Sequence, residues 1–435
     1  MKKFAIVLAT LALLAGCSED RSQILKVYNW SNYIDEDLIG EFEQWYEEQT
    51  GESVKVIYQT FDVNETMLSK IELGQEDYDV VCPSDYIIEH MLASDLLLPL
   101  DFDFGSTPNY ISNVSPCIVS YFDQIDGHGK NANEYSVAYM WGTNGLLYNP
   151  SHVNPESFDS WEVLRDPAYA GKILMKEAFR DVYLSLLVGL NKDAIDSGQK
   201  DIKTITFDCS DESIALVEDF LNSFKDGICG YEADFGKEEM TKDRAWLSFN
   251  WSGDAQWAIE EAEKVGITLD YAVPKCGSTI WFDGWVIPKY SKNVKAASYW
   301  INYMCMPENA IRNMAEVGYV SAIGGPEILA AQTDEEKYEP LDASYFFGEG
   351  AEAVCLSPVQ YPDKSIVERC GMLHDNGEDT PKLLAMWSRV KGDSATSWTA
   401  IIIGIAVVGL AALIIARKLS RKGRKHHSGS SKKRR

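Results

Sequence analysis

Short hydrophobic runs typical of β-strands alternate with amphipathic stretches along most of the chain. Residues 24–30 and 53–61 form two such runs. Between them, residues 37–50 carry apolar side chains at helical spacing, and Gly51 follows as a stop signal. This part of the chain is therefore predicted to form a strand, a helix and a second strand.

The same alternation continues beyond residue 61. Further strands are predicted at residues 78–82, 135–140, 145–148, 172–175, 246–251, 270–273 and 279–287. Helices are predicted at residues 180–190, 212–225, 254–265, 294–306, 308–316, 364–373 and 381–391. Strands that alternate with helices form largely parallel sheets with helices on both faces. The fold class is thus α/β, and the elements fit two such sheets better than one.

The first residues have the pattern of a secretory signal. Lys2 and Lys3 precede an apolar run, and the segment Leu14-Ala15-Gly16-Cys17 resembles a bacterial lipobox, in which the chain is cut before a cysteine that is then lipidated. Residues 1–17 are therefore expected to be a lipoprotein signal peptide, with lipidation at Cys17. An ordinary signal with a chance cysteine is the alternative.

A membrane segment is also predicted near the other end of the chain. Residues 398–416 carry no charge, and a spanning helix needs about 20 such residues. Residues 417–435 are dense in Lys and Arg, which indicates the cytoplasmic side of a membrane. We expect a transmembrane helix at residues 398–416 and a basic cytoplasmic tail at residues 417–435, with a buried core helix as the alternative.

The charge distribution separates these ends from the body of the chain. The 435 residues carry a net charge of −26, but residues 1–17 and 397–435 hold twelve of the 40 basic residues and no acid. The body between them therefore carries a net charge of −38. Such a body repels a phosphate backbone, so nucleic acid is excluded as a partner.

No catalytic or metal-binding motif stands out. The chain has no GxSxG, P-loop or HExxH motif, and no GxGxxG that opens a helix. The eight cysteines after Cys17 include no CxxC pair, and the sequence does not decide between disulfides and free thiols. We predict no catalytic residues, no metal site and no cofactor. An exported hydrolase that uses two of the 66 acidic residues stays open as an alternative.

Aromatic and acidic residues cluster at the ends of predicted strands or within them. The clusters are residues 28–33 (YNWSNY), 83–86 (PSDY), 250–254 (NWSGD) and 281–285 (WFDGW). Ligands of open α/β sheets bind outside the carboxyl ends of strands, and side chains two apart share a face, so Trp281 and Asp283 can face one ligand. Aromatic faces beside carboxylates suit an organic cation. Core packing is the alternative for any single residue.

At these clusters the chain resembles the spermidine/putrescine-binding proteins of bacterial ABC importers, a family of type 2 periplasmic binding proteins. The resemblance runs from about residue 25 to residue 391. Its ordered landmarks are residues 28–33, 81–86 (VCPSDY), 138–149 (AYMWGTNGLLYN), 160–173 (SWEVLRDPAYAGKI), 179–183 (FRDVY), 249–255 (FNWSGDA), 281–288 (WFDGWVIP) and 317–322 (VGYVSA).

The resemblance implies a two-lobed fold with a hinge and a ligand-binding set of ten residues. These are Trp30, Tyr33, Ser84, Tyr86, Glu177, Asp181, Trp251, Trp281, Asp283 and Tyr319. An amine with a pKa near 10.4 is charged at pH 7, so a diamine needs a carboxylate at each end. Asp283 is expected at one end and Asp181 or Glu177 at the other, with the aromatic rings around the methylenes.

Two positions depart from the family pattern. Ala178 stands where the family often has a second acid, and Glu177 is one position away. Leu373 falls where spermidine binders have a Gln, so the resemblance does not rank spermidine against putrescine.

The function that we expect is therefore capture of a polyamine outside the cytoplasm and delivery to an ABC permease and its ATPase, without catalysis. The protein is expected at the extracytoplasmic face of a bacterial cytoplasmic membrane, held there by its lipid and its helix. Lobe 1 is expected at residues 24–135 and 275–320, and lobe 2 at residues 136–274 and 321–392. Binding of another small solute, such as a sugar or another organic cation, and a role as a surface sensor are the alternatives.

Overall fold

The computed structural model describes residues 20–74, 76–232 and 236–392. They divide into two units, with the break after Thr380. The predicted signal peptide with Cys17, the transmembrane helix at 398–416 and the tail at 417–435 lie outside the described residues. No helix in the described ranges is both long and apolar enough to cross a membrane.

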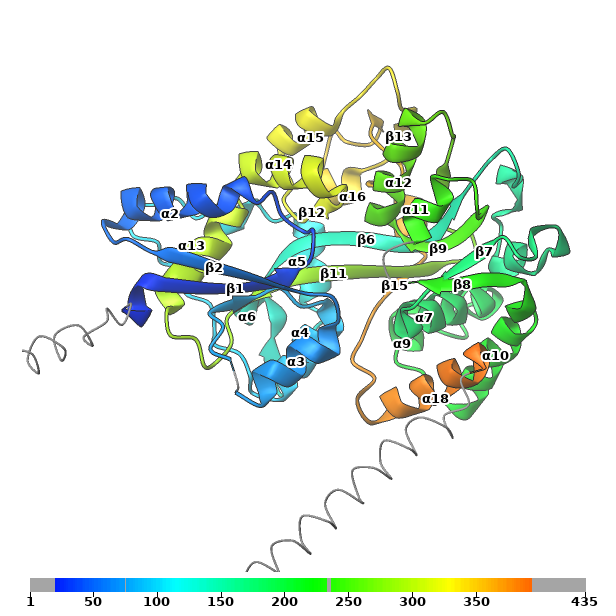
Figure 1. Cartoon of the computed structure of the whole chain (residues 1–435), viewed down its shortest axis with the longest axis horizontal. Helices are drawn as coiled ribbons and strands as arrows, with labels where there is room; N and C mark the ends of the chain where they lie inside the picture. The colour runs from blue at the N-terminus through cyan, green and yellow to red at the C-terminus, as the bar shows by residue number, and fades with distance from the viewer. Residues whose placement is uncertain (1–19, 75, 233–235, 393–435) are drawn as a thin grey trace, which may run out of the picture. The chain divides into compact units, whose positions relative to one another are not determined.

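A mixed sheet forms the centre of the first unit (Figure 1). Its path is β2-β1-β3-β11-β6-β9-β7-β8, and three further strands pair with β6 or β11. Its strands are β1 (Ile24–Trp30), β2 (Lys55–Phe61), β3 (Val80–Val81), β6 (Ser136–Tyr148), β7 (Ile173–Lys176), β8 (Ile228–Glu232), β9 (Leu247–Trp251), β10 (Asp270–Ala272), β11 (Ser278–Val286), β12 (Val320–Ser321) and β15 (Cys370–Met372).

Two long strands, β6 and β11, connect two groups of parallel strands. β1 pairs in parallel with β2 and β3, and β7 pairs in parallel with β8 and β9. β6 and β11 run antiparallel to each other, and the second half of β6 pairs with β9. The prediction of two separate, largely parallel sheets is therefore wrong. β6 continues through residues 141–144, where the sequence pattern predicted a break, and joins the two groups into one sheet.

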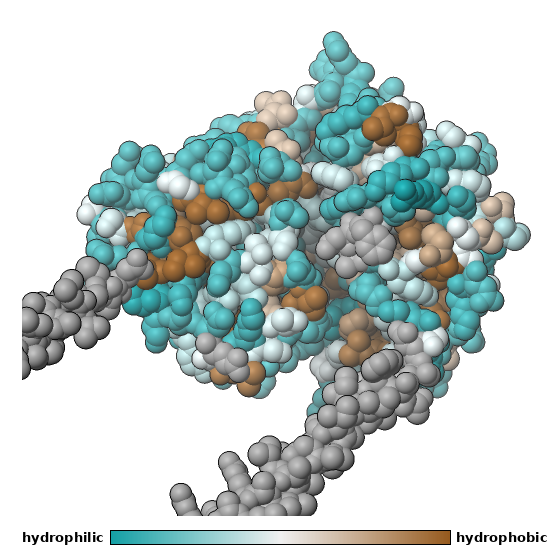
Figure 2. Space-filling view, viewed as in Figure 1, coloured by the Kyte–Doolittle hydropathy of each residue, from teal (hydrophilic) through white to brown (hydrophobic). Residues whose placement is uncertain are grey.

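Helices lie on both sides of this sheet, with α2 and α12 on one side and α4 and α7 on the other in Figure 1. The surface over α2 is largely hydrophilic in Figure 2, as expected for an amphipathic helix. The longer helices of this unit are α2 (Asp37–Thr50), α3 (Asn64–Glu72), α4 (Asp85–Ala93), α7 (Phe179–Leu190), α10 (Asp211–Asn222), α12 (Ser252–Lys264), α13 (Val294–Met304) and α14 (Pro307–Val317). Most predicted helices are confirmed, whereas α3 and strand β8 were not predicted.

The helix predicted at residues 364–373 is wrong. Only α17 (Lys364–Val367) is helical there, and the chain then forms β15, which pairs in parallel with β11. A short apolar stretch fits both periods, and here pairing with β11 decides the outcome. In the second unit, α18 (Thr380–Lys391) confirms the helix predicted at residues 381–391. The eight cysteines of the described part are free thiols.

Candidate functional site

Asp283 is a buried carboxylate in the middle of β11. It accepts hydrogen bonds from the hydroxyls of Tyr33 and Ser84, both at 2.7 Å. Only 6% of the residue is exposed. Burial raises the pKa of Asp283 to about 6, although both hydroxyls favour the ionised form and oppose this shift. The site thus holds a carboxylate that carries its charge without a cationic partner in the described part of the chain.

A β-bulge in β6 lies opposite this part of β11. The register between β11 and β6 shifts between Asp283 and Gly284, and Asp283 forms an isolated bridge with Ser84 at the start of α4. The unpaired residue at this shift is Tyr139 of β6, and bulges are frequent next to binding sites. The bridge with Ser84 joins the loop after β3 to the middle of β11.

Three aromatic rings form a contiguous group that reaches this carboxylate through the Tyr33 hydroxyl. The ring centres of Tyr33 and Tyr319 are 5.1 Å apart, and those of Trp281 and Tyr319 are 5.6 Å apart. Two glycines make the close packing possible. A Cβ atom on Gly253 would lie 2.3 Å from the Tyr319 ring, and one on Gly142 would lie 2.5 Å from the Trp281 ring. The glycines of the WGTNG and WSGD segments therefore shape the site because they have no side chains and leave room for the two rings.

Asp181 is a second buried carboxylate, in the first turn of α7. It accepts hydrogen bonds from the indole N–H of Trp251 at 3.0 Å and from the side-chain amide of Asn144 at 3.2 Å. Burial raises the pKa of Asp181, and these two donors and the charge of Arg180 oppose the shift. The charge of Asp181 also contributes to the raised pKa of Asp283, so the two carboxylates share one electrostatic environment.

Ser84 and Tyr86 lie at the start of α4 and share one donor. The side-chain amide of Asn64 donates to the hydroxyls of Ser84 at 3.0 Å and Tyr86 at 2.9 Å. The guanidinium carbon of Arg180 lies 3.8 Å from the centre of the Tyr86 ring. Residues from both strand groups therefore meet here.

The other two predicted residues differ from this set. Trp30 ends β1, and its ring packs on Phe61 with the ring centres 4.6 Å apart. Glu177 follows β7 and is exposed, whereas the other nine predicted residues are buried or half-buried. Of the two acids predicted for the second end of the ligand, Asp181 is therefore buried and Glu177 is not.

Several residues of the site were not predicted from the sequence. Asn144 and Asn64 hold Asp181 and the Ser84–Tyr86 pair, and each has a buried Oδ1 atom without a hydrogen-bond partner in the described residues. Asn144 lies inside an apolar strand pattern, which is a signal that could have identified it. Asn64 lies in α3, a helix that the sequence pattern did not predict.

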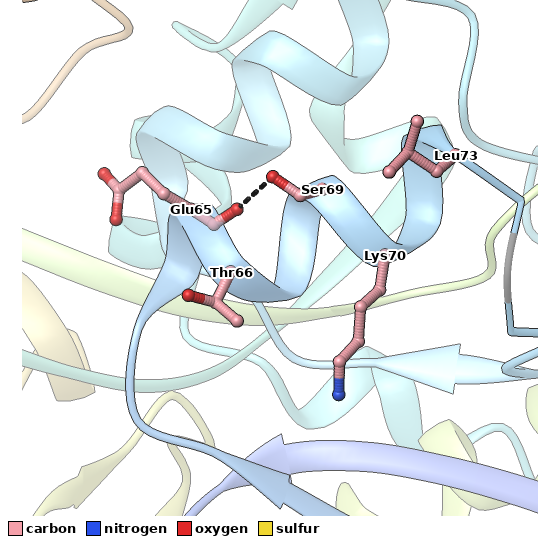
Figure 3. Close-up of a pocket in the computed structure, with 5 residues that line it drawn as sticks. All are labelled: Glu65, Thr66, Ser69, Lys70 and Leu73. Carbon is pink, nitrogen blue, oxygen red and sulfur yellow. Dashed lines mark hydrogen bonds between the residues drawn. The ribbon is translucent and has the colours of Figure 1, made fainter. Parts of the chain in front are cut away.

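A surface depression on α3 lies beside this region. It has a volume of about 420 Å³ and is lined by Glu65, Thr66, Ser69, Lys70 and Leu73 (Figure 3). In Figure 3 the Ser69 hydroxyl bonds to the backbone oxygen of Glu65, at 2.8 Å, and Lys70 points away from them. All five residues come from one helix or its end, and four are exposed. The depression therefore lacks the converging polar groups that Asp283 and Asp181 receive.

Comparison with known proteins identifies the family of the chain. The family of bacterial extracellular solute-binding proteins matches residues 42–326. The chain belongs to this family. Members of this bacterial extracellular solute-binding protein family bind solutes outside the cytoplasm and are not enzymes, so the exported-hydrolase alternative is not supported.

Individual relatives include polyamine binders. The chain is 28% identical to the spermidine/putrescine-binding periplasmic protein of Escherichia coli (strain K12), over 78% of this chain and 90% of that protein. It is 26% identical to a putrescine-binding periplasmic protein of the same organism, over 77% of this chain and 88% of that protein.

A solved structure has the same fold. The spermidine/putrescine ABC transporter substrate-binding protein of Streptococcus pneumoniae superposes with a TM-score of 0.63 and 30% sequence identity, over 85% of this chain and 99% of that chain. The two-lobed α/β fold of periplasmic binding proteins predicted from the sequence is thereby confirmed.

Proposed function

We propose that the chain captures a polyamine, putrescine or spermidine, outside the cytoplasm and delivers it to an ABC importer. The observation that carries this proposal is the pair of buried carboxylates, Asp283 and Asp181, whose hydrogen-bond donors are all neutral. Buried charges are normally paired, and no lysine or arginine of the described residues forms an ion pair with either carboxylate, although the Arg180 charge partly opposes the raised pKa of Asp181. Two such carboxylates favour a ligand that supplies two cations. The names of the relatives support the same class of ligand.

The remaining groups of the site suit an amine in the same way. The rings of Tyr33, Trp281 and Tyr319 offer faces to methylenes and to an ammonium group, each such contact contributing about 0.5–2 kcal/mol. The unpartnered Oδ1 atoms of Asn64 and Asn144 are acceptors, and an ammonium group is a donor of three hydrogen bonds. In this proposal Ser84 and Tyr33 orient Asp283, and Trp251 and Asn144 orient Asp181.

Delivery follows from closure of two lobes about a hinge. We place the hinge at β6 and β11, with lobe boundaries near residues 135, 275 and 320. Closure around the ligand creates the surface that the permease and its ATPase recognise. A lipid on Cys17 and a helix at residues 398–416 hold the protein at the extracytoplasmic face of the membrane.

Calorimetry tests the proposed ligand class. The full-length chain, purified in detergent, is titrated with putrescine, spermidine, a neutral sugar and a neutral amino acid. We expect micromolar or tighter binding of at least one polyamine and no heat with the sugar or the amino acid. Binding of the sugar or the amino acid without binding of either polyamine contradicts the proposal.

A further inference from the structure

A buried ion cluster lies behind the Trp251 ring. Lys176, the last residue of β7, has no exposed side-chain area. Its Nζ atom lies 2.7 Å from Asp254, 3.4 Å from Glu232 and 4.2 Å from the centre of the Trp251 ring. Since the Trp251 indole N–H donates to Asp181, this cation is separated from a carboxylate of the proposed site by one aromatic ring.

The cluster is neutral as a whole. Asp254 also accepts a hydrogen bond from Lys237 at 2.9 Å, so two lysines face two carboxylates. Burial favours the neutral form of Asp254, but Lys176 and Lys237 outweigh it and lower the pKa of Asp254 to about 2. Asp254 and Glu232 are therefore already compensated, and neither attracts a ligand cation as a free carboxylate does.

Asp254 is also tied to the aromatic rings of the site. Its Oδ1 atom accepts the Tyr319 hydroxyl at 2.9 Å. The ion cluster thus contacts two rings of the site. Lys176 packs against the Trp251 ring, and Asp254 holds the Tyr319 hydroxyl by a hydrogen bond. This cluster is part of the environment that the ligand meets, and it offers the ligand no net negative charge.

A second cation lies against the Tyr86 ring. Arg180 is 5% exposed, its guanidinium carbon lies 3.8 Å from the centre of that ring, and its Nη1 atom lies 3.5 Å from Glu65. Its Nε atom donates to Asn376 at 3.1 Å. Two aromatic rings of the proposed site, those of Trp251 and Tyr86, therefore each carry a protein cation on one face.

Another buried carboxylate near Asp283 belongs to the fold. The two carboxylate oxygens of Asp85 each accept a hydrogen bond from a backbone N–H group. The donors are Tyr86 at 2.8 Å and Phe282 at 3.2 Å. It links α4 to β11 and has no oxygen free of a backbone donor. Asp283 and Asp181 are thus the two carboxylates that are left for a ligand in this part of the described chain.

We propose that this charge arrangement makes the site selective for a diamine over a triamine, with Lys176 and Arg180 as the residues that set the limit. The inference rests on the proposed polyamine-binding function. A diamine brings two charges to two carboxylates that form no ion pair with a lysine or arginine of the described residues. A third ammonium would be buried near Lys176 or Arg180 without a carboxylate of its own, which is unfavourable because a buried charge without a partner costs several kcal/mol.

The first test varies the ligand and leaves the full-length chain unchanged. Calorimetry compares putrescine, spermidine and 1,8-diaminooctane, a diamine with the length of spermidine in which a methylene replaces the central amine. We expect putrescine to bind at least about tenfold more tightly than spermidine, and 1,8-diaminooctane to bind more tightly than spermidine, because the burial cost follows charge rather than length.

The outcomes separate this inference from the proposed function. Equal or tighter binding of spermidine than putrescine overturns the diamine selectivity and leaves polyamine binding intact. Weak binding of 1,8-diaminooctane, no better than that of spermidine, shows that length and not charge sets the limit and overturns the charge argument. Absence of binding by all three amines overturns the proposed function itself.

The second test varies the cation. Lys176→Met keeps the length of the side chain and leaves Asp254 and Glu232 with Lys237 alone, so one carboxylate loses its compensation beside Trp251. We expect spermidine affinity relative to putrescine to rise by at least about tenfold. Lys237→Met changes a half-buried lysine of the same cluster and should also raise spermidine affinity relative to putrescine. This variant provides the test if Lys176→Met does not fold.

Lys242→Met is the matched control. Lys242 pairs with Glu238 on the surface, and 45% of its side chain is exposed, so its removal should leave the ratio of spermidine to putrescine affinity unchanged. An unchanged ratio in the Lys176 and Lys237 variants, or an equal change in the Lys242 variant, overturns the role of the buried cluster.

Discussion

The Tyr33 hydroxyl donates a hydrogen bond to Asp283 at 2.7 Å, across 250 positions of sequence. The bond joins the loop after the first strand of the sheet to the middle of β11. Tyr33 stays neutral, because burial and the Asp283 charge raise its pKa well above the usual value. The pair therefore consists of a fixed donor and a carboxylate whose protonation state can change near neutral pH.

Removal of the carboxylate charge should weaken ligand binding. In Asp283→Asn the shape is retained, but one ammonium of the ligand is left without its anion. Loss of one partner of a buried charge pair costs about 2–5 kcal/mol, so we expect polyamine affinity to fall at least about tenfold by calorimetry. Asp159→Asn, which changes an exposed carboxylate paired with Lys275, is the control and should bind normally. Unchanged affinity in Asp283→Asn removes this residue from the site.

Acidification should weaken binding through the same group. The pKa of Asp283 is raised to about 6 in the ligand-free protein, so the carboxylate takes up a proton as the pH falls through this value. Bound ammonium requires the ionised form, and the dissociation constant should rise about tenfold for each pH unit well below 6. Calorimetry between pH 5 and 8 measures this effect. The profile of Asp283→Asn should be flatter over the same interval, and equally steep profiles would assign the effect to another group.

Acidification has the opposite effect on the stability of the ligand-free protein, which it should increase through Asp283. The folded-state pKa of Asp283 lies above its ordinary value, so protonation favours the folded state. This contribution to the free energy of unfolding is fully present below about pH 4 and is lost as the pH rises through about 6. Ligand should stabilise the protein most at the pH values where this contribution is absent.

The Tyr33 hydroxyl should shift this pH dependence. Tyr33→Phe removes a donor that favours ionised Asp283, so the pKa of Asp283 rises further and the midpoint of the binding profile moves to higher pH. Loss of about 1.5 kcal/mol for a hydrogen bond to a charged group raises this pKa by about one unit, so about half of Asp283 is protonated at pH 7 and affinity there should fall about twofold, with a larger fall at pH 6. Tyr290→Phe, at an exposed tyrosine, is the control. A lower affinity without a shifted midpoint would mean that Tyr33 acts through packing alone.

Local sequence pattern predicted some features of the site and could not predict others. Trp281 and Asp283 are two apart on one strand, so their shared face followed from strand geometry. The link between Lys176 and Asp254 spans 78 positions and depends on how β7 meets α12, which no local period encodes. The continuous course of β6 was missed for a similar reason, because Gly142 reads as a strand break but serves close packing against Trp281.

The last prediction concerns the space beside Tyr319. A Cβ atom on Gly253 would lie 2.3 Å from the Tyr319 ring, closer than atoms can approach, so Gly253→Ala must displace that ring. The ring contacts both Tyr33 and Trp281, and its hydroxyl donates to Asp254, so the displacement affects the group of aromatic rings that reaches Asp283. We expect polyamine affinity to fall about tenfold, since misplaced binding groups lose preorganisation.

Gly40→Ala is the matched control for this substitution. Gly40 is exposed within α2, and a Cβ atom there meets nothing within 4 Å. Alanine in a helix interior is favoured over glycine by about 0.5–1 kcal/mol, so this variant should be slightly more stable by thermal melting and should bind the ligand normally. If Gly253→Ala binds the ligand as well as Gly40→Ala does, the position of the Tyr319 ring does not determine affinity, and Tyr319 is a packing residue rather than part of the binding site.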